Sequence, residues 1–315
     1  MSDDSRRVGP GDLFVARPGT KSDGGAFARD ALAAGAAAVV AQSRMDDLPL
    51  PVIVVPDAAA AVSPLAHAVA GDPSREVKVL AVTGTNGKTT TTYLIRHILN
   101  AVKRKCGMIG TVAIDDGATV AEAEMTTPGA VDVARLLARM RDNGCRACAI
   151  EASSHALDQS RLSGVTLAGA AFTNLTLDHL DYHKSMDAYG AAKAKLFTQL
   201  GPDAVAAVNL DDPHHARMTE QCRARVVTFG IGRDADYRAA DVAATAAGTS
   251  FILHTPDGTT EVHLRLIGRH NIENALAAVT LCCEAAGVSI HQAAGALATA
   301  DGAPGRLQAV RTDGP

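Results

Sequence analysis

Short apolar runs and longer amphipathic segments alternate along most of the chain. After residue 77, apolar runs typical of buried strands lie at 79–82, 107–114, 147–151, 168–173, 204–208 and 226–229. Segments with a helical spacing of apolar residues lie at 88–102, 129–143, 187–199, 271–286 and 289–299. Strands that alternate with helices in this way predict a doubly wound, mostly parallel α/β sheet.

The region 236–267 has a different pattern. Apolar and polar residues alternate one by one in 250–254 and 262–266, which is typical of strands that bury one face. We therefore expect an antiparallel hairpin appended to the parallel sheet.

The first 73 residues predict a smaller α/β domain. Strands are expected at 13–16, 38–40 and 52–55, and helices at about 27–35 and 57–70. Only three residues precede Asp4, where such a unit would normally have another strand, so its start is either truncated or a short sheet edge. A stretch rich in turn residues at 71–74 predicts a linker, and we expect domains at 1–73 and 77–303.

Composition limits the class of protein. At 315 residues the chain suits two domains, and its 47% hydrophobic and 20% charged residues are typical of a globular protein with a sizeable core. The net charge of -4 gives no support for nucleic acid or an anionic membrane surface as a partner. Apolar runs stay short of the roughly 18 residues that span a bilayer, and the polar N-terminus is unlike a signal peptide, so we expect a cytoplasmic protein.

The six cysteines show no disulfide framework. Cys145 and Cys148 form a C-x-x-C pair, which is the spacing of half a zinc site or of a redox pair. A second such pair does not follow, and Cys148 begins an apolar run. We therefore interpret both as buried free thiols.

A glycine-rich loop follows the strand at 79–82. Its sequence is Gly84-Thr85-Asn86-Gly87-Lys88-Thr89, and Thr90 continues into the helical segment. A strand, a glycine loop and a helix N-terminus form an anion site, because backbone N–H groups and the helix dipole face the ligand. Lys88 would add a charge for the β- and γ-phosphates, and the Thr89 hydroxyl would ligate Mg²⁺. Val82 stands where the usual phosphate loop has its first glycine, yet the loop still predicts a nucleoside triphosphate site.

Polar residues also follow the other expected strands. Ligands of open α/β sheets bind beyond the C-terminal ends of the strands, and a triphosphate requires Mg²⁺. Glu151 ends an apolar strand, where it is either a Mg²⁺ ligand or the partner of an arginine, and we favour the ligand. His179 and His183 are four apart on one face of an expected helix and have no third ligand for zinc. We therefore assign a Mg²⁺ or phosphate contact to His179 and a structural role to His183.

Lys193 is expected to point inward. It shares a helical face with Tyr189, Leu196 and Phe197. An inward lysine is either a buried stem with its charge at the surface or a functional amine, and the spacing leaves both alternatives open.

These motifs occur together in one known family. In chain order they are Gly84-Thr85-Asn86-Gly87-Lys88-Thr89, Thr126-Thr127-Pro128, Glu151-Ala152-Ser153-Ser154-His155-Ala156-Leu157, the run from Asp178 to His183, and Ala191-Ala192-Lys193. The chain resembles the Mur ligases, and within them the MurE type; Asp4-Ser5-Arg6 resembles part of that family's first domain. The resemblance implies an ATP-dependent ligase of peptidoglycan precursor synthesis. ATP would phosphorylate the D-glutamyl carboxylate of UDP-N-acetylmuramoyl-L-alanyl-D-glutamate, and the amine of a diamino acid would attack the acyl phosphate.

The resemblance also implies roles for single residues. The UDP group would be held by Ser5, Thr20, Lys21 and Ser22, and the muramoyl dipeptide by Thr126, Thr127, Ser153, Gln159 and Arg161. ATP would contact Gly84, Thr85, Asn86, Gly87, Lys88, Thr89 and Thr90, together with Asn271, Asn274 and Arg306. The catalytic groups would be Lys88, Glu151, His179 and Lys193. Mg²⁺ would be held by Thr89, Glu151, His179 and Lys193, the last as a carbamate.

The sequence departs from the family pattern in two places. His270 replaces the phenylalanine that the family usually has beside adenine. The family continues past the position of Arg306 into a third domain that binds the incoming amino acid, so 304–315 is expected to begin a linker to a domain absent from this chain. We expect an incomplete ligase, which is either a fragment or one half of a split enzyme whose third domain a separate chain supplies. Whether it adds diaminopimelate or lysine stays open. The alternatives are a non-catalytic subunit that binds nucleotide and UDP substrate, and a related ligase such as folylpolyglutamate synthase.

Overall fold

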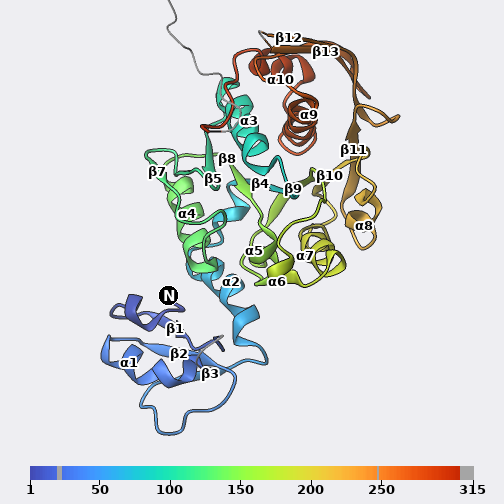
Figure 1. Cartoon of the computed structure of the whole chain (residues 1–315). Helices are drawn as coiled ribbons and strands as arrows, with labels where there is room; N and C mark the ends of the chain where they lie inside the picture. The colour runs from blue at the N-terminus through green and yellow to red at the C-terminus, as the bar shows by residue number, and fades with distance from the viewer. Residues whose placement is uncertain (20–22, 247, 306–315) are drawn as a thin grey trace, which may run out of the picture. The chain divides into compact units, whose positions relative to one another are not determined.

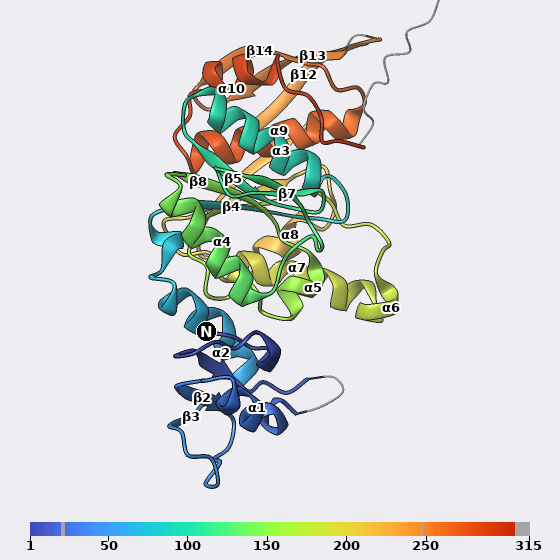
Figure 2. The same cartoon turned by 90° about the vertical axis from the view of Figure 1, so that its left-hand side faces the viewer.

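The computed structural model describes residues 1–19, 23–246 and 248–305, and the chain divides into two compact units (Figure 1 and Figure 2). The first unit comprises Met1–Pro73, Pro128–Ala138 and Gln159–Val165. The second comprises Ser74–Thr127, Arg139–Asp158 and the described residues from Thr166 onward.

The first unit contains a three-stranded parallel sheet in the order β1 (Leu13–Val15), β2 (Ala38–Ala41) and β3 (Val52–Val54). Its helices are η1 (Ser5–Arg7), η2 (Gly24–Phe27), α1 (Ala28–Ala33), α2 (Ala58–Val69) and the first residues of α4 (Ala130–Asp142). Asp57 caps α2, because its side chain accepts a hydrogen bond from Ala60 N.

Neighbouring residues of β1 belong to different apolar clusters, as the two-residue period of a strand requires. Phe14 packs in a cluster with Ala28 and Ala31 of α1. Val15 packs in a second cluster with Val62 of α2 and the beginning of α4. The small sheet is therefore covered by apolar side chains on both faces.

The second unit is built on an 11-stranded sheet in the order β14-β13-β12-β11-β10-β9-β4-β8-β5-β6-β7. Strands from β12 through β5 pair in parallel, and the strands at both ends of the sheet pair antiparallel. The bounds are β4 (Lys78–Thr83), β5 (Cys106–Ile109), β6 (Ala113–Asp115), β7 (Val120–Glu122), β8 (Ala147–Glu151), β9 (Leu167–Phe172), β10 (Val205–Asn209), β11 (Arg225–Gly230), β12 (Tyr237–Thr245), β13 (Gly248–Thr255) and β14 (Gly258–Leu264). The predicted doubly wound, mostly parallel sheet with antiparallel strands appended is confirmed.

Helices lie on both faces of this sheet (Figure 1 and Figure 2). One face carries α3 (Lys88–Ala101), α9 (Arg269–Glu284) and α10 (Ile290–Leu297), and the other carries α5 (Ser154–Asp158), α7 (Met186–Thr198) and α8 (His215–Thr219). The short η3 (Pro73–Arg75) precedes β4, and α6 (Leu180–His183) precedes α7. Leu94 and Ile98 of α3 join Leu276 of α9 in the main apolar core. This packing holds α3 against the sheet. The glycine loop connects the end of β4 to the start of α3.

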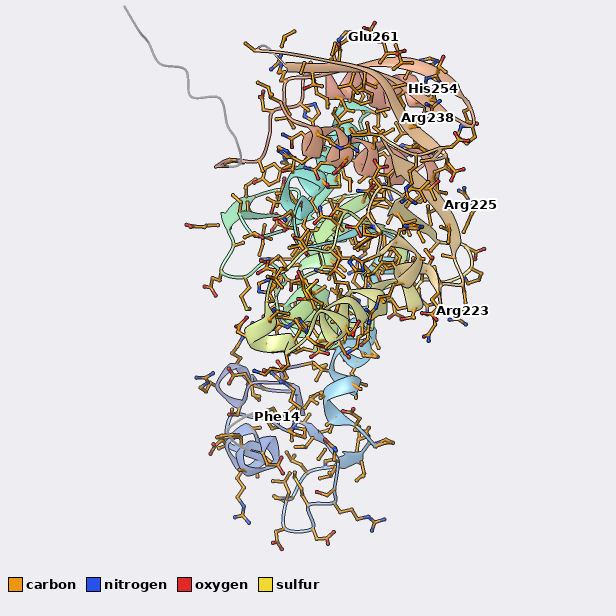
Figure 3. The ribbon with its side chains drawn as sticks, turned by 45° about the vertical axis from the view of Figure 1, so that its right-hand side comes forward. Phe14, Arg223, Arg225, Arg238, His254 and Glu261 are labelled. Atoms are coloured by element: carbon orange, nitrogen blue, oxygen red, sulfur yellow. The ribbon has the colours of Figure 1, made fainter. Side chains whose placement is uncertain are left out.

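The antiparallel extension has one apolar and one polar face. Phe251 and Leu253 of β13 are buried in the main core. Arg238, His254 and Glu261 lie on the strands of the extension and point away from the helices (Figure 3). Where a two-stranded hairpin was expected, the extension has three antiparallel strands, β12, β13 and β14. It joins the parallel sheet through β12, which begins parallel to β11.

The expected strand at 107–114 is wrong as a single strand. It is divided into β5 and β6, which pair antiparallel across a turn at Gly110 and Thr111. A side chain at Gly110 would require Glu151 to move, because its Cβ would lie 2.5 Å from Glu151 Oε1. The turn thus lets the chain pass close to Glu151, and it adds β6 and β7 to the edge of the sheet.

The cysteines and the helices agree with two further expectations. All six cysteines are free, and Cys145 and Cys148 are buried. The interpretation of the C-x-x-C pair as buried free thiols is therefore confirmed, and burial raises the pKa of both thiols. Within the described residues, no helix is long and apolar enough to cross a membrane.

Candidate functional site

The glycine-rich loop connects β4 to α3 in a conformation that requires both of its glycines. Gly84 has φ +150° and Gly87 has φ +89°. A Cβ at Gly84 would lie 1.9 Å from Thr173 Oγ1, and one at Gly87 would lie 2.2 Å from Asn274 Oδ1. Because Gly87 is the residue before α3, the loop delivers the chain directly to a helix N-terminus, where the helix dipole favours an anion.

Lys88 is folded back over this loop. Its Nζ donates to Gly84 O at 2.8 Å and to Thr85 O at 2.9 Å. Both acceptors are neutral carbonyl groups, so a phosphate oxygen would bind the same ammonium group more strongly.

Glu151 ends β8 and is completely buried, with 0% of its surface exposed. Its Oε2 accepts from Thr89 Oγ1 and its Oε1 accepts from Thr111 N, at 3.0 and 2.8 Å. Thr111 Oγ1 also lies 3.0 Å from Glu151 Oε2. Among the described residues Glu151 has no arginine partner, which weakens the alternative of a salt bridge, because the partners found are hydroxyl groups and a backbone amide.

Hydroxyl groups connect Glu151 to the segment expected to hold substrate. Thr111 Oγ1 lies 3.0 Å from Thr126 Oγ1. Thr127 Oγ1 donates to Glu151 O at 2.6 Å and accepts from Ser153 N at 3.1 Å. Thr126, Thr127 and Ser153 are therefore brought together beside Glu151.

Lys193 lies on α7 and is 1% exposed. Its Nζ donates to Gly84 O at 2.8 Å and stands 4.3 Å from the centre of the Tyr189 ring, a cation–π distance. Burial, with the charge of Lys88 as a smaller cause, lowers the pKa of Lys193 well below its ordinary value. Lys193 therefore points inward along its whole length, and its surroundings make the charged form less favourable than it is in water.

His179 precedes α6 in a left-handed conformation with φ 52°. The expectation that it shares a helix face with His183 is wrong, because α6 begins only at Leu180. The left-handed turn is supported by Asp178, whose Oδ1 accepts from His179 N at 2.9 Å.

The imidazole of His179 packs in a group of aromatic rings. The His155 and Tyr189 rings lie 5.1 and 6.0 Å from it between centroids. His183 is buried in the same group, 5.6 Å from His155, and its Nε2 has no hydrogen-bond partner among the described residues. Burial, and next the nearby His155, lower the pKa of His183. These surroundings suit the structural role expected for His183.

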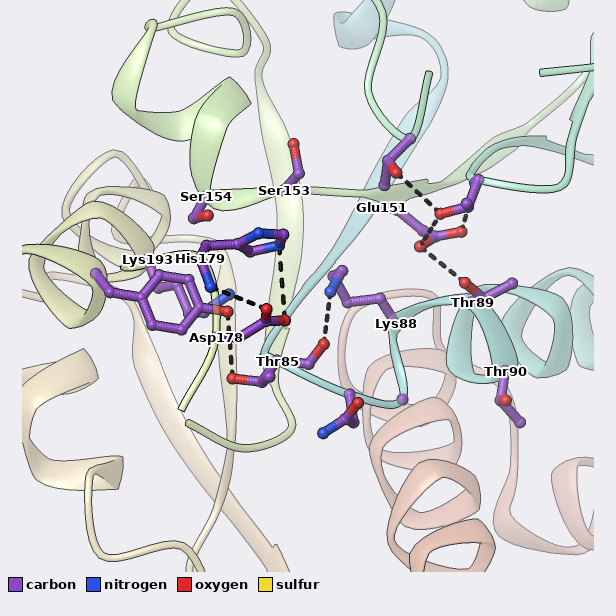
Figure 4. Close-up of a pocket in the computed structure, with 15 residues that line it drawn as sticks. Thr85, Lys88, Thr89, Thr90, Glu151, Ser153, Ser154, Asp178, His179 and Lys193 are labelled. Atoms are coloured by element: carbon purple, nitrogen blue, oxygen red, sulfur yellow. Dashed lines mark hydrogen bonds and ion pairs between the residues drawn. The ribbon is translucent and has the colours of Figure 1, made fainter. Parts of the chain in front are cut away.

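These groups line one cavity of about 300 Å³ (Figure 4). Of the predicted residues, its lining includes Thr85, Asn86, Gly87, Lys88, Thr89, Thr90, Thr126, Glu151, Ser153, His179 and Lys193. It also includes Thr111, Ser154, Asp178 and Tyr189, which the sequence interpretation did not select. Asp178 and Ser154 are next in sequence to predicted site residues, so the sequence could have indicated them. Thr111 lay within an expected strand, and only the preceding glycine, Gly110, could have indicated a turn there.

Other predicted residues lie elsewhere. Asn271 and Asn274 are buried on α9 and bonded to each other, Asn274 Nδ2 donating to Asn271 Oδ1 at 3.2 Å. The Asn274 side chain lies next to Gly87 of the glycine loop. Ser5 begins η1 in the first unit. Gln159 and Arg161 belong to the same unit, where Arg161 Nη2 donates to Gln159 Oε1 at 2.8 Å. Thr20, Lys21, Ser22 and Arg306 lie outside the described residues.

The donors at the cavity suit Mg²⁺ better than a metal enclosed by protein alone. In the part of the chain that the structure describes, no group of three His, Cys, Asp or Glu side chains could hold a metal ion. Mg²⁺ prefers oxygen ligands and is usually bound through one or two carboxylates together with substrate phosphates. Glu151 and the Thr89 hydroxyl, beside a phosphate loop, provide such a partial set.

Comparisons with known proteins give consistent results across the chain. The family model "Mur ligase family, catalytic domain" matches residues 1–80, and "Mur ligase middle domain" matches residues 82–282. A UDP-N-acetylmuramoyl-L-alanyl-D-glutamate--2,6-diaminopimelate ligase from Thermosynechococcus vestitus is 43% identical over 307 residues, which are 96% of this chain and 62% of that protein. The ligase of the same name from Geobacillus kaustophilus is 42% identical over 313 residues, with coverage of 98% and 64%.

A solved structure supports the same relationship. It is described as a UDP-N-acetylmuramoyl-L-alanyl-D-glutamate--2,6-diaminopimelate ligase, is 31% identical and superposes with a TM-score of 0.86 over 99% of this chain and 64% of that one. The chain thus spans less than two thirds of the length of these relatives. With family models matched from residue 1 to residue 282, the chain belongs to the Mur ligase family.

Proposed function

We propose that the chain provides the ATP-binding and carboxylate-activating part of a ligase that adds an amino acid to UDP-N-acetylmuramoyl-L-alanyl-D-glutamate. The observation that carries this proposal is the cavity at which the phosphate loop, Glu151, His179 and Lys193 meet. The names of the relatives support the substrate, since the ligases from Thermosynechococcus vestitus and Geobacillus kaustophilus act on this dipeptide and 2,6-diaminopimelate.

The proposed reaction has two steps. A carboxylate oxygen of the D-glutamyl group attacks the γ-phosphorus of ATP, and ADP leaves with the electrons of the broken P–O bond. The amine of the incoming amino acid then attacks the acyl phosphate carbon, phosphate leaves, and a proton is lost from the nitrogen. Lys88 would neutralise charge on the transferred phosphoryl group, because it already lies over the loop that would cradle the phosphates.

Mg²⁺ would contact Thr89, Glu151 and His179, and when bound it supplies positive charge to the phosphate oxygens. Glu151 supports this role, since it is buried and, within the part of the chain that the structure describes, has hydrogen bonds from neutral donors and no cationic partner. His179 and the Thr89 hydroxyl belong to the same cavity.

Lys193 is proposed to act as a carbamate. Its neutral amine would attack CO₂, form an N–C bond and release a proton, and the product would be an oxygen ligand for Mg²⁺. The lowered pKa of Lys193 supports this step, because only the neutral amine is nucleophilic.

Substrate contacts are proposed for residues in both units. Ser5, Thr20, Lys21 and Ser22 in the N-terminal domain (1–73) would hold the UDP group, and Thr126, Thr127, Ser153, Gln159 and Arg161 the muramoyl dipeptide. Asn271, Asn274 and Arg306 would lie on the nucleotide side. The site for the incoming amino acid is assigned to the part of the relatives' length that these 315 residues do not span, whether on the same chain or a separate one. The soluble substrates agree with a cytoplasmic location.

Calorimetric titration with ADP and Mg²⁺ tests the proposal. We expect saturable binding by the unaltered chain and a loss of at least about tenfold in affinity for Lys88→Ala, since a charge-assisted contact to phosphate is removed. Lys78→Ala is the matched control, because Lys78 is an exposed lysine on β4 that bonds Ala285 O and lies outside the cavity lining. Absence of binding, or equal affinities of the two variants, would overturn the proposal.

A further inference from the structure

The phosphate loop is held by the segment Thr173–Thr176, which follows β9. Thr85 N donates to Asn174 O at 2.8 Å, and Asn86 N donates to Asn174 Oδ1 at 2.9 Å. Thr173 Oγ1 donates in turn to Asn86 O at 2.6 Å. Two amides at the centre of the loop are thus bound to Asn174, so the loop's shape depends on a distant segment as well as on its own glycines.

The Thr85 hydroxyl group also binds the loop to this segment, and it makes three hydrogen bonds. Its Oγ1 donates to Thr176 O at 3.2 Å and accepts from Thr176 N at 2.9 Å and from Tyr189 Oη at 3.2 Å. A hydroxyl group has one proton to donate and two lone pairs, so these contacts use its full capacity. Thr85 is 9% exposed and Tyr189 is 0% exposed, so water would not easily replace the lost partner.

The two elements that meet at Thr85 carry other groups of the cavity. The segment Thr173–Thr176 continues within three residues to His179. Tyr189 lies one helical turn before Lys193 on α7, and Lys193 itself donates to Gly84 O, next to Thr85. Figure 4 shows Thr85 at the centre of this arrangement, between Lys88 on one side and Lys193 and His179 on the other.

We infer that Thr85 is a positioning residue, whose hydroxyl group couples the phosphate loop to the elements that carry His179 and Lys193. The inference rests on the proposed function, because it assumes that a magnesium nucleotide binds at this cavity. Valine has nearly the same shape as threonine but would leave the N–H and C=O of Thr176 and the hydroxyl of Tyr189 without their partner. Serine would keep all of these contacts.

The test compares the affinity for ADP in the presence of Mg²⁺ in the unaltered chain, Thr85→Val and Thr85→Ser. We expect Thr85→Val to lower the affinity about tenfold, and Thr85→Ser to stay within about threefold of the unaltered chain. Tyr237→Phe is a matched control, since it removes a buried hydroxyl that donates to Glu284 Oε1 at 2.6 Å outside the cavity lining. It should lower the urea midpoint of the protein without changing the affinity for the nucleotide.

A double-mutant cycle with His179→Ala separates positioning from general destabilisation. If Thr85 acts partly through His179, the combined loss in affinity will be smaller than the product of the two single losses, by about fivefold. Losses that simply multiply would overturn the coupling to His179.

The outcomes distinguish the inference from the proposed function. No nucleotide binding by the unaltered chain would overturn the proposed function and the inference with it. Equal binding by the unaltered chain and Thr85→Val would overturn the inference alone. Should Thr85→Val not fold, Tyr189→Phe removes only one of the three hydrogen bonds, and we expect it to lower the affinity about threefold. Unchanged affinity in that variant would likewise overturn the inference.

Discussion

Glu151 and Lys193 are side chains of opposite charge buried at one cavity, and their surroundings differ. Glu151 accepts hydrogen bonds from two hydroxyl groups and a backbone amide. Among the described residues Lys193 donates to one carbonyl group, Gly84 O, and its ammonium group lies over the Tyr189 ring. Hydrogen bonds to a charged group contribute about 1.5–3 kcal/mol each, so the number of donors around Glu151 and the number of acceptors around Lys193 make a real difference between the two side chains.

This difference separates a carboxyl group whose oxygens are held by several donors from an amine whose charged form is disfavoured by burial. The oxygens of Glu151 are held in place before any cation arrives, which suits a Mg²⁺ ligand. The ammonium form of Lys193 is disfavoured by burial, which lowers its pKa and suits an amine that is to be modified. Substitution of either residue alone tests this difference.

The largest effect is expected from Glu151→Gln. Glutamine keeps the size of the side chain but removes its charge, so we expect the affinity for ADP to fall about 50-fold with Mg²⁺ present and less than about threefold without it. Calorimetry in Mg²⁺ and in chelator measures both values. Glu284→Gln is the matched control, because Glu284 accepts from Tyr237 and Arg225 outside the cavity lining. Equal losses with and without Mg²⁺ would contradict a role through the cation.

Lys193→Met should make the unliganded protein more stable at neutral pH in bicarbonate-free buffer. A lysine whose folded-state pKa lies below its ordinary value of 10.5 binds its proton more readily when the chain is unfolded. Its cost to stability is therefore present at neutral pH and disappears as the pH rises toward 10.5. We expect the variant to gain about 1–2 kcal/mol in the free energy of unfolding at pH about 7 and less at pH about 9.5.

Urea unfolding at the two pH values measures this gain. Lys195→Met on the same helix is the control, because the half-exposed Lys195 pairs with Asp158 at the surface. Its substitution should change stability by less than about 0.5 kcal/mol at both values. A gain for Lys193→Met that does not shrink with rising pH would show that Lys193 is not a disfavoured cation.

The sequence predicted those parts of the site that depend on local patterns. The glycines at 84 and 87 mark the loop, and the parallel sheet explains why Glu151 and the residues after β9 reach the same edge, since the carboxyl ends of parallel strands lie together. Helical spacing was sufficient to place Lys193 on the inner face of α7.

Local sequence patterns could not predict the features that depend on contacts between distant segments. The hydroxyl of Thr85 meets Thr176, 91 positions away, and no periodicity records that pairing. His179 has a left-handed conformation, whereas its spacing from His183 suggested a helix. The turn at Gly110 was hidden because the apolar residues on both sides of it resemble one continuous strand.

Thr111 lies in that turn, and Thr111→Val gives the smallest effect that we predict. The substitution removes the hydroxyl group 3.0 Å from Glu151 Oε2 and leaves the bond from Thr111 N in place. Because Glu151 keeps its charge and two donors, we expect the affinity for ADP with Mg²⁺ to fall only about threefold, and Thr111→Ser to restore it. A loss as large as that of Glu151→Gln would mean that the hydroxyl groups around Glu151 matter as much as its charge, and the contrast with Lys193 would then be one of hydrogen bonding alone.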